Sequence, residues 1–229
     1  MSGVISCVGV SRTFAGKAIA PVKAVDNVTF EVQAGEFVAI QGPSGSGKTT
    51  LLGMLCGIEQ PDGGTVTLLG HDLARLTGAE RARLRRTNVG MVFQSFGLVP
   101  ALSVGENVAL PLTLGGMAPA ERTTRAMEAL TSVGLDGVAD KRIDELSGGQ
   151  RQRVGVARAI VSRPEVVLAD EPTGSLDDET AASILALLRQ RTEDLGASLV
   201  LVTHDPGSAA GADRRFHMLD GRLAEGGQA

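Results

Sequence analysis

The chain has 229 residues, enough for one or two compact domains with a sizeable hydrophobic core. Its composition, 43% hydrophobic and 21% charged, is typical of globular proteins, and no stretch approaches the ~20 uninterrupted apolar residues of a membrane span. A net charge of −4 argues against a general attraction to nucleic acids or anionic lipids.

Apolar runs of strand length alternate with segments of helical period along the chain. Several runs are short, β-branched and apolar throughout, as expected of strands covered on both faces. The predicted strands are Val4–Val10, Val25–Val32, Phe37–Ile40, Thr65–Leu69, Val89–Phe93, Glu165–Ala169, Ser198–Val202 and Phe216–Leu219. The predicted helices are Lys48–Cys56, Ala79–Arg86, Val104–Leu112, Pro119–Val133, Gly148–Val161, Asp178–Glu193 and a short one after Asp205.

Strands gather before Gln94 and after Arg163, and the stretch between them is predicted to be helical. The simplest arrangement is a single α/β nucleotide-binding domain. Its core would comprise residues 1–94 and 162–229, and residues 95–161 would form a helical insert.

One octapeptide fits the phosphate-binding pattern G-x-x-x-x-G-K-[ST] without departure. It reads Gly42, Pro43, Ser44, Gly45, Ser46, Gly47, Lys48 and Thr49. An apolar strand precedes it and a helix-competent run follows, which is the context that identifies a P-loop. The glycines let backbone N–H groups turn towards phosphate oxygens, and the helix points its positive end at the same anion. Lys48 would reach the β- and γ-phosphates and Thr49 would hold Mg²⁺.

A second apolar strand ends in two carboxylates, Asp170 and Glu171. In a P-loop protein Asp170 would bind Mg²⁺, and Glu171, one residue further on, can orient or deprotonate a water in line with the γ-phosphate. Alone, this pair would favour the interpretation as the polar end of a strand, and the P-loop in the same chain reverses that preference.

The run Leu146-Ser147-Gly148-Gly149-Gln150 resembles the signature motif of ABC ATPases, and the resemblance covers nearly the whole chain. It implies a P-loop NTPase (RecA-like) core with an N-terminal antiparallel β subdomain and an inserted α-helical subdomain. It also implies Mg²⁺-dependent ATP hydrolysis by a head-to-tail homodimer, because the signature motif caps the γ-phosphate held by the partner's P-loop. The alternative is a polar helix cap that binds no ligand.

The resemblance assigns roles to four further positions. Gln94 resembles the Q-loop glutamine, which touches Mg²⁺ or the attacking water, and His204 resembles the switch histidine at the γ-phosphate. Asp177 resembles the aspartate that crosses the dimer interface. Phe14 stands where the family places an aromatic residue against adenine, and an ordinary core role is its alternative. The expected catalytic groups are Lys48, Gln94, Glu171 and His204, the Mg²⁺ ligands are Thr49, Gln94 and Asp170, and the remaining nucleotide contacts are Phe14, Gly42–Thr50, Ser147–Gln150 and Asp177.

Two segments indicate a branch of the family. Thr173-Gly174 follows the catalytic carboxylates, and Gly105–Leu112 follows the Q-loop. Both resemble the branch of the lipoprotein-extracting (LolD), macrolide-exporting (MacB) and division (FtsE) ATPases. The resemblance implies coupling of ATP-driven closure to export or extraction through a MacB-, LolC- or FtsX-like permease. The alternatives are an FtsE-like mechanotransmitter that moves no solute and an ABC ATPase that acts on DNA or ribosomes.

The partners expected from this resemblance are a second copy of the chain and a membrane permease. Phe96 and Leu98 are predicted to receive a short helix of the permease, whereas Leu102 is expected to pack the insert. The basic cluster Arg81–Arg86 has helical spacing and reads as a solvated face, so no nucleic-acid partner is expected. The N-terminus shows no signal-peptide pattern. The resemblance implies a peripheral location at the cytoplasmic face of the bacterial inner or plasma membrane, held there by the permease.

Cys7 and Cys56, the two cysteines of the chain, both lie in apolar runs and lack the spacing of metal ligands. We therefore expect both to be buried free thiols.

Overall fold

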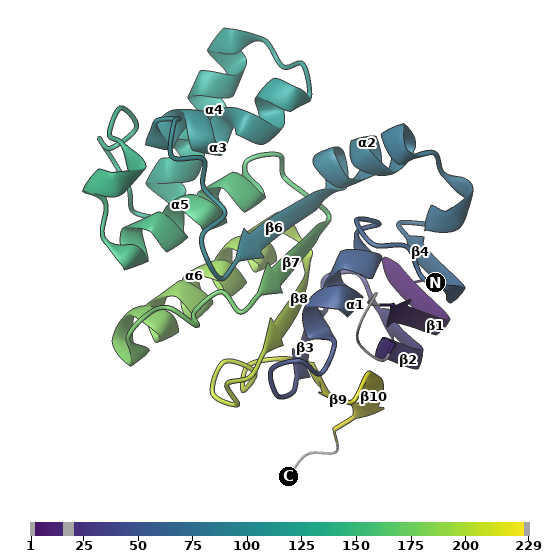
Figure 1. The fold of residues 1–229 in the computed structure, drawn as a ribbon. Coiled ribbons are helices and arrows are strands. Elements are labelled where there is room, and N and C mark those ends of the chain that lie inside the picture. Colours follow the sequence, from purple (N-terminus) through teal and green to yellow (C-terminus); the bar gives the residue numbers. More distant parts are fainter. Residues whose placement is uncertain (1–2, 16–20, 227–229) are drawn as a thin grey trace. The chain divides into compact units, whose positions relative to one another are not determined.

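The computed structural model describes residues 3–15 and 21–226 (Figure 1). These residues form two compact units: one comprises the described chain up to Arg85 together with the chain from Ser198 onwards, and the other is Arg86–Ala197. Among the described residues, no helix combines the length and apolar character needed to cross a bilayer.

The first unit contains an antiparallel sheet. It is built from β1 (Ile5–Phe14), β2 (Val22–Val32), β4 (Gly63–Leu68) and β5 (His71–Asp72), in the order β2-β1-β4-β5. Alternate side chains of β2, from Val28 through Phe30 to Val32, are buried, as expected of a sheet with one covered face. This sheet confirms the predicted N-terminal antiparallel β subdomain.

The same unit holds a second set of strands around β3 (Phe37–Gln41). β3 pairs in parallel with β8 (Ser198–Thr203) on one side and with β9 (Arg214–Leu219) on the other, and β10 (Arg222–Glu225) adds an antiparallel edge. Val38–Ile40 are fully buried, which explains why the strand is apolar throughout. Helix α1 (Lys48–Leu55) follows β3 and buries Leu51, Met54 and Leu55. Helix η1 (Leu73–Arg75) is a short 3₁₀ turn, and α2 (Gly78–Asn88) runs across the boundary between the units.

The second unit combines a pair of parallel strands with a group of helices. The strands are β6 (Val89–Phe93) and β7 (Val166–Asp170), which pair over their whole length. The helices are α3 (Val104–Leu114), α4 (Pro119–Ser132), the 3₁₀ turn η2 (Ile143–Glu145), α5 (Gly148–Ile160) and α6 (Asp178–Leu195). Helix α5 packs against β6, α3, α4 and α6, so it is the central helix of this unit (Figure 1).

Several helices in this unit begin or end at residues that are common at helix termini. Ser103 and Ser147 begin α3 and α5 with capping boxes, in which the serine hydroxyl accepts from a backbone amide and a Glu or Gln side chain accepts in return. Pro119 occupies the first turn of α4. Helix α6 ends at Gly196, whose φ of 65° is the left-handed conformation that closes many helices.

The prediction of a short helix after Asp205 is wrong. Residues 206–211 form consecutive turns, with amides of Ala209, Ala210 and Ala212 donating to carbonyls three residues back. The segment is shorter than two helical turns and contains two glycines, which makes helix nucleation unfavourable. The other predicted elements are present, with ends that differ by up to four residues, and β5 and β10 were not predicted.

Both cysteines are buried free thiols, as predicted. Burial raises the pKa of the Cys7 thiol to about 12 and also raises the pKa of Cys56.

Candidate nucleotide-binding site

The P-loop lies between β3 and α1 in the first unit and wraps around the Lys48 side chain. Lys48 is 5% exposed, and its ammonium group donates to the carbonyl oxygens of Gly42 at 2.7 Å and Pro43 at 3.0 Å. A buried ammonium group requires such acceptors. The lysine therefore sits inside the loop, at the end of the helix where backbone amides attract anions.

Gly47, at the N-cap of α1, shows why the loop needs glycine. Its φ is 105°, a conformation that side chains rarely adopt, and a Cβ atom there would lie 1.9 Å from the Ala24 carbonyl oxygen of β2. Strand β2 is thus packed directly against the P-loop backbone. Any side chain at this position would have to displace that strand.

The P-loop also contains a polar atom that fits a phosphate ligand. The Ser46 hydroxyl oxygen is buried and has no hydrogen-bond partner among the described residues. Buried hydroxyl groups are nearly always paired, and an unpaired one calls for an explanation. An anion cradled by the loop amides would supply the acceptor, so the loop fits a nucleotide phosphate.

His204 stands beside the P-loop within the same unit. The parallel pairing of β3 with β8 sets Gln41 opposite Thr203, and the amide of Gly42 donates to the Thr203 carbonyl at 3.3 Å. His204 is the next residue along and is exposed. The structure therefore brings this histidine and the P-loop to the same edge of the strands, and its contact with the γ-phosphate stays a prediction.

Phe14 ends β1, where it pairs with Val22 of β2. Phe14 is 41% exposed, which argues against the alternative of an ordinary core residue. The guanidinium carbon of Arg12 lies 4.8 Å from the ring centroid. One face of the ring is therefore covered by a cation, and such a ring can still stack a base on its other face.

Sequence reasoning missed Arg12, although a pattern in the sequence points to it. Residues two apart on a strand can share a face, so a strand that continues to Phe14 would have made Arg12 its neighbour. Arg12 also forms ion pairs with Asp62 at 2.7 Å and Glu59 at 3.3 Å. Hydrogen bonds from the Thr13 amide and Arg12 hold the pKa of Asp62 below its usual range, so this anchor of the β1 end stays ionised.

The second unit gathers a different set of predicted residues at the carboxyl ends of β6 and β7. Phe93 pairs with Asp170, so Gln94 and Glu171 leave the two strands side by side. The Ser175 hydroxyl donates to the Gln94 carbonyl at 3.3 Å. A Cβ atom on Gly174 would lie 2.9 Å from the Gln94 side-chain nitrogen, so the glutamine packs against the loop that follows Glu171.

Glu171 has a backbone φ of 45°, in the left-handed region that non-glycine residues seldom enter. Its carbonyl accepts from the amide of Gly174 at 3.1 Å in a tight turn. Strained backbone of this kind gathers at functional sites, where the surrounding structure holds it. The strain marks Glu171 rather than the neighbouring Asp170, and it agrees with a catalytic role for that carboxylate.

The signature residues begin α5 and lie beside the start of α6. The Ser147 hydroxyl accepts from the Gln150 amide at 3.3 Å, and the Gln150 side chain accepts from the Ser147 amide at 2.9 Å. Cβ atoms on Gly148 and Gly149 would approach Leu176 and Thr180. The structure thus shows the helix cap that the sequence offered as an alternative, and a cap leaves the first amides of α5 available to an anion.

Asp177 is the N-cap of α6. Its carboxylate accepts from the Thr180 amide at 2.9 Å, and this hydrogen bond, more than any other, lowers the pKa of Asp177. The residue is therefore ionised at neutral pH. Its position places the capped end of α6 next to the signature residues, within the same unit.

The donor atoms at the predicted metal ligands are all oxygens: the Thr49 hydroxyl, the Gln94 amide and the Asp170 carboxylate. Mg²⁺ prefers oxygen ligands and usually takes one or two carboxylates together with substrate phosphates. The donor chemistry of each of these residues suits that ion, and their assignment as its ligands stays a prediction.

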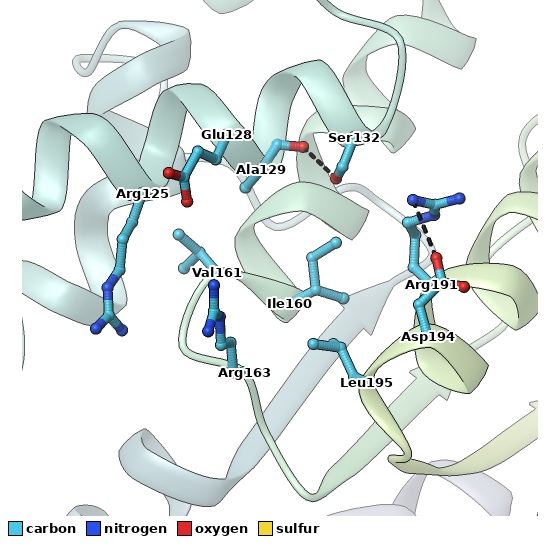
Figure 2. A pocket seen from close by; sticks show the side chains of 10 residues that line it. All are labelled: Arg125, Glu128, Ala129, Ser132, Ile160, Val161, Arg163, Arg191, Asp194 and Leu195. Atoms are coloured by element: carbon cyan, nitrogen blue, oxygen red, sulfur yellow. Dashed lines mark hydrogen bonds and ion pairs between the residues drawn. The ribbon is translucent and has the colours of Figure 1, made fainter.

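A separate hollow of about 170 Å³ lies between α4 and the ends of α5 and α6 (Figure 2). Ile160 and Leu195 form part of its apolar surface, and Arg191 is paired there with Asp194 at 3.1 Å. The described residues that line it include none of the predicted nucleotide contacts.

Comparison with known proteins adds the family. A profile described as "ABC transporter" matches residues 25–174. The methionine import ATP-binding protein MetN of Cereibacter sphaeroides is 43% identical over 219 residues, which are 95% of this chain and 62% of MetN. The lipoprotein-releasing system ATP-binding protein LolD of Chromohalobacter salexigens is 42% identical over 222 residues, 97% of this chain and 93% of LolD. A dimeric post-hydrolysis structure of the ATP-binding cassette MJ0796, bound to ADP and Pi, matches with a TM-score of 0.89 at 37% identity and covers 97% of both chains.

The chain belongs to the ABC transporter family, as an ATP-binding cassette ATPase, and the predicted family and fold class are confirmed. Within the family it falls in the branch of LolD, MacB and FtsE.

Proposed function

We propose that the chain hydrolyses ATP with Mg²⁺ and couples closure of a head-to-tail dimer to export or extraction of a hydrophobic or amphipathic substrate. The membrane partner would be a MacB-, LolC- or FtsX-like permease, which would hold the chain at the cytoplasmic face of the plasma membrane. The observation that carries the proposal is the P-loop folded around the buried Lys48, with an unpaired Ser46 hydroxyl beside it. The relatives include both a methionine import protein and a lipoprotein-releasing protein, so the proposed direction of transport rests on the branch.

Each site residue would contribute a distinct part of the reaction. Lys48 neutralises charge on the β- and γ-phosphates, and His204 contacts the γ-phosphate. Glu171 orients the attacking water and accepts its proton. Mg²⁺, held by Thr49, Gln94 and Asp170, would offset the negative charge that develops on the phosphate oxygens. Phe14 would stack on the adenine through the ring face that Arg12 leaves open.

The proposed dimer joins the P-loop of one chain to Ser147 of its partner. In a Glu171→Gln background, which keeps ATP bound, we expect Mg·ATP to convert monomers into dimers, measured by multi-angle light scattering. Adding Ser147→Arg should abolish the dimer, because a long cation replaces the small hydroxyl at the start of α5. Ser103→Arg is the matched control, since Ser103 caps α3 with the same capping box. Dimers that survive Ser147→Arg, or vanish equally with Ser103→Arg, would remove the composite site from the proposal.

The permease is proposed to bind at Phe96 and Leu98. Both side chains are partly exposed, and the neighbouring Val99 is 37% exposed. The buried Asn107 side chain holds the loop beyond them, donating to the carbonyls of Val99 and Leu102 at 3.0 and 3.2 Å. The loop thus has a fixed shape while it presents apolar groups, which suits an amphipathic helix of a partner.

We expect Phe96→Ser combined with Leu98→Ser to abolish co-purification with the permease, and stimulation by it. Hydrolysis by the isolated chain should stay close to that of the wild type, because neither side chain is a nucleotide contact. The control is Leu114→Ser combined with Met127→Ser, which removes two exposed apolar groups elsewhere in the same unit. Full stimulation of the Phe96/Leu98 variant would place the docking surface elsewhere.

A further inference from the structure

Arg158 of α5 is a buried cation that no part of the proposed chemistry uses. It is 8% exposed, and burial lowers the pKa of its guanidinium. Arginine nevertheless stays charged in proteins, so the structure must supply partners for it. It does so with two backbone carbonyls: the guanidinium donates to Gly97 and, at 3.1 Å, to Phe96.

These two carbonyls belong to an unusual turn. Phe96 and Gly97 have φ values of 63° and 59°, so two successive residues are left-handed. A Cβ atom on Gly97 would lie 2.7 Å from the Phe93 ring and 3.2 Å from the Arg158 guanidinium. The backbone of Phe96 lacks the conformational freedom of glycine. A bulky residue keeps a left-handed backbone only where the surrounding structure enforces it. The Arg158 guanidinium holds this turn in place through its hydrogen bonds to the two carbonyls.

A second side chain of α5 holds the start of the same loop. Gln152 is completely buried, and its amide nitrogen donates to the Phe93 carbonyl at 3.3 Å. Gln152 and Arg158 are six residues apart on α5, which places them about 120° apart around the helix axis, and both side chains are buried. The segment from Phe93 to Gly97, which contains Gln94, is thus bound at both ends to the helix that begins with the signature residues.

We propose that Arg158 is a positioning residue that makes the turn at Phe96 and Gly97 follow the signature helix α5. Nucleotide bound at the start of α5 would then reposition the permease-docking residues Phe96 and Leu98. This inference rests on the proposed function, because it assumes that ATP acts on α5 through the signature motif. It goes further by naming the contact that carries the coupling. Helix α5 is suited to this task because one end carries the signature and its buried side carries the loop.

The test uses hydrogen–deuterium exchange of the full chain in the Glu171→Gln background, with and without Mg·ATP. In the Glu171→Gln chain with Arg158 intact, ATP should change the exchange rates of the amides of Phe96 and Gly97. With Arg158→Met, we expect that ATP-dependent change to be lost. The affinity of the variant for ATP should stay within about 5-fold of that of the parent chain, because 5-fold is the smallest change in affinity that typical allosteric coupling produces. Arg153→Met is the matched control: Arg153 lies on the same helix, but it binds the Val133 carbonyl and the Ser183 hydroxyl.

Arg158→Lys is a second variant, included in case Arg158→Met does not fold. It keeps the positive charge but cannot donate in the forked geometry of a guanidinium, so it should fold and give a reduced response. An undiminished ATP response in either Arg158 variant would overturn the inference. Loss of the response in Arg153→Met as well would also overturn it, because the effect would then be general to the helix. If Mg·ATP does not bind or alter exchange when Arg158 is intact, the failure lies in the proposed function and not in the Arg158 contact.

Discussion

Glu171→Gln should lower steady-state ATP hydrolysis by on the order of 10²–10³ while leaving ATP bound. The substitution removes the proton acceptor but keeps the shape of the side chain. It also keeps the backbone strain, because glutamine at a φ of 45° is no more favourable than glutamate. A change in rate therefore reports the carboxylate and not a relaxed turn. The measurement is phosphate release at saturating Mg·ATP, together with retention of labelled ATP after gel filtration.

The matched control for this prediction is Glu165→Gln. Glu165 is exposed and immediately precedes the same strand, β7, at the end away from Asp170. Its neutralisation should leave hydrolysis at the wild-type rate. Hydrolysis by Glu171→Gln at the wild-type rate would sink the assignment of the catalytic base.

Lys48→Ala should reduce hydrolysis by at least a similar factor, on the order of 10²–10³, and should weaken ATP binding as well. The ammonium group would neutralise phosphate charge both in bound ATP and in the transition state. It also bridges the Gly42 and Pro43 carbonyls, which lose a shared donor in the variant. Binding is measured by isothermal titration calorimetry with Mg·ATP, and hydrolysis by phosphate release.

Lys141→Ala is the control, since Lys141 is an exposed lysine of the second unit. A melting temperature measured without nucleotide separates the two roles of Lys48. If Lys48→Ala melts as the wild type does and still binds and hydrolyses ATP normally, the P-loop assignment is wrong.

Local patterns predicted most of the elements because each pattern is contained within the element itself. The run Val89–Phe93 is a strand with the predicted ends, since it is apolar throughout and buried by its surroundings. β10 was not predicted because Arg222–Glu225 has only four residues, two of them charged, and it is a strand through its pairing with β9. The prediction for the segment after Asp205 was wrong in the opposite direction: a helix was expected there, and the glycines and short length of the segment prevented one.

The features of the candidate site also divide into those that a local sequence pattern predicts and those that depend on contacts between distant residues. The P-loop and the signature are continuous in sequence, so residue types and spacing were enough to find them. The hydrogen bond from Arg158 to Gly97 joins residues 61 apart, and no local pattern identifies such a distant partner. A local pattern does indicate that Arg158 needs a partner, because it is the single charged residue in the otherwise apolar run Val154–Val161. A buried charge within an apolar helix must find a partner, and the structure identifies which one.

The burial of both native thiols makes the chain a convenient carrier for site-specific labels. With a pKa of about 12, Cys7 has on the order of one thiolate in 10⁵ molecules at pH 7, and Cys56 is shielded in the same manner. Maleimide reagents attack thiolates that solvent reaches, so the wild-type protein should remain nearly unmodified. A cysteine introduced at Leu114, whose side chain is 62% exposed, would then take up a fluorophore or spin label without prior removal of the natural cysteines.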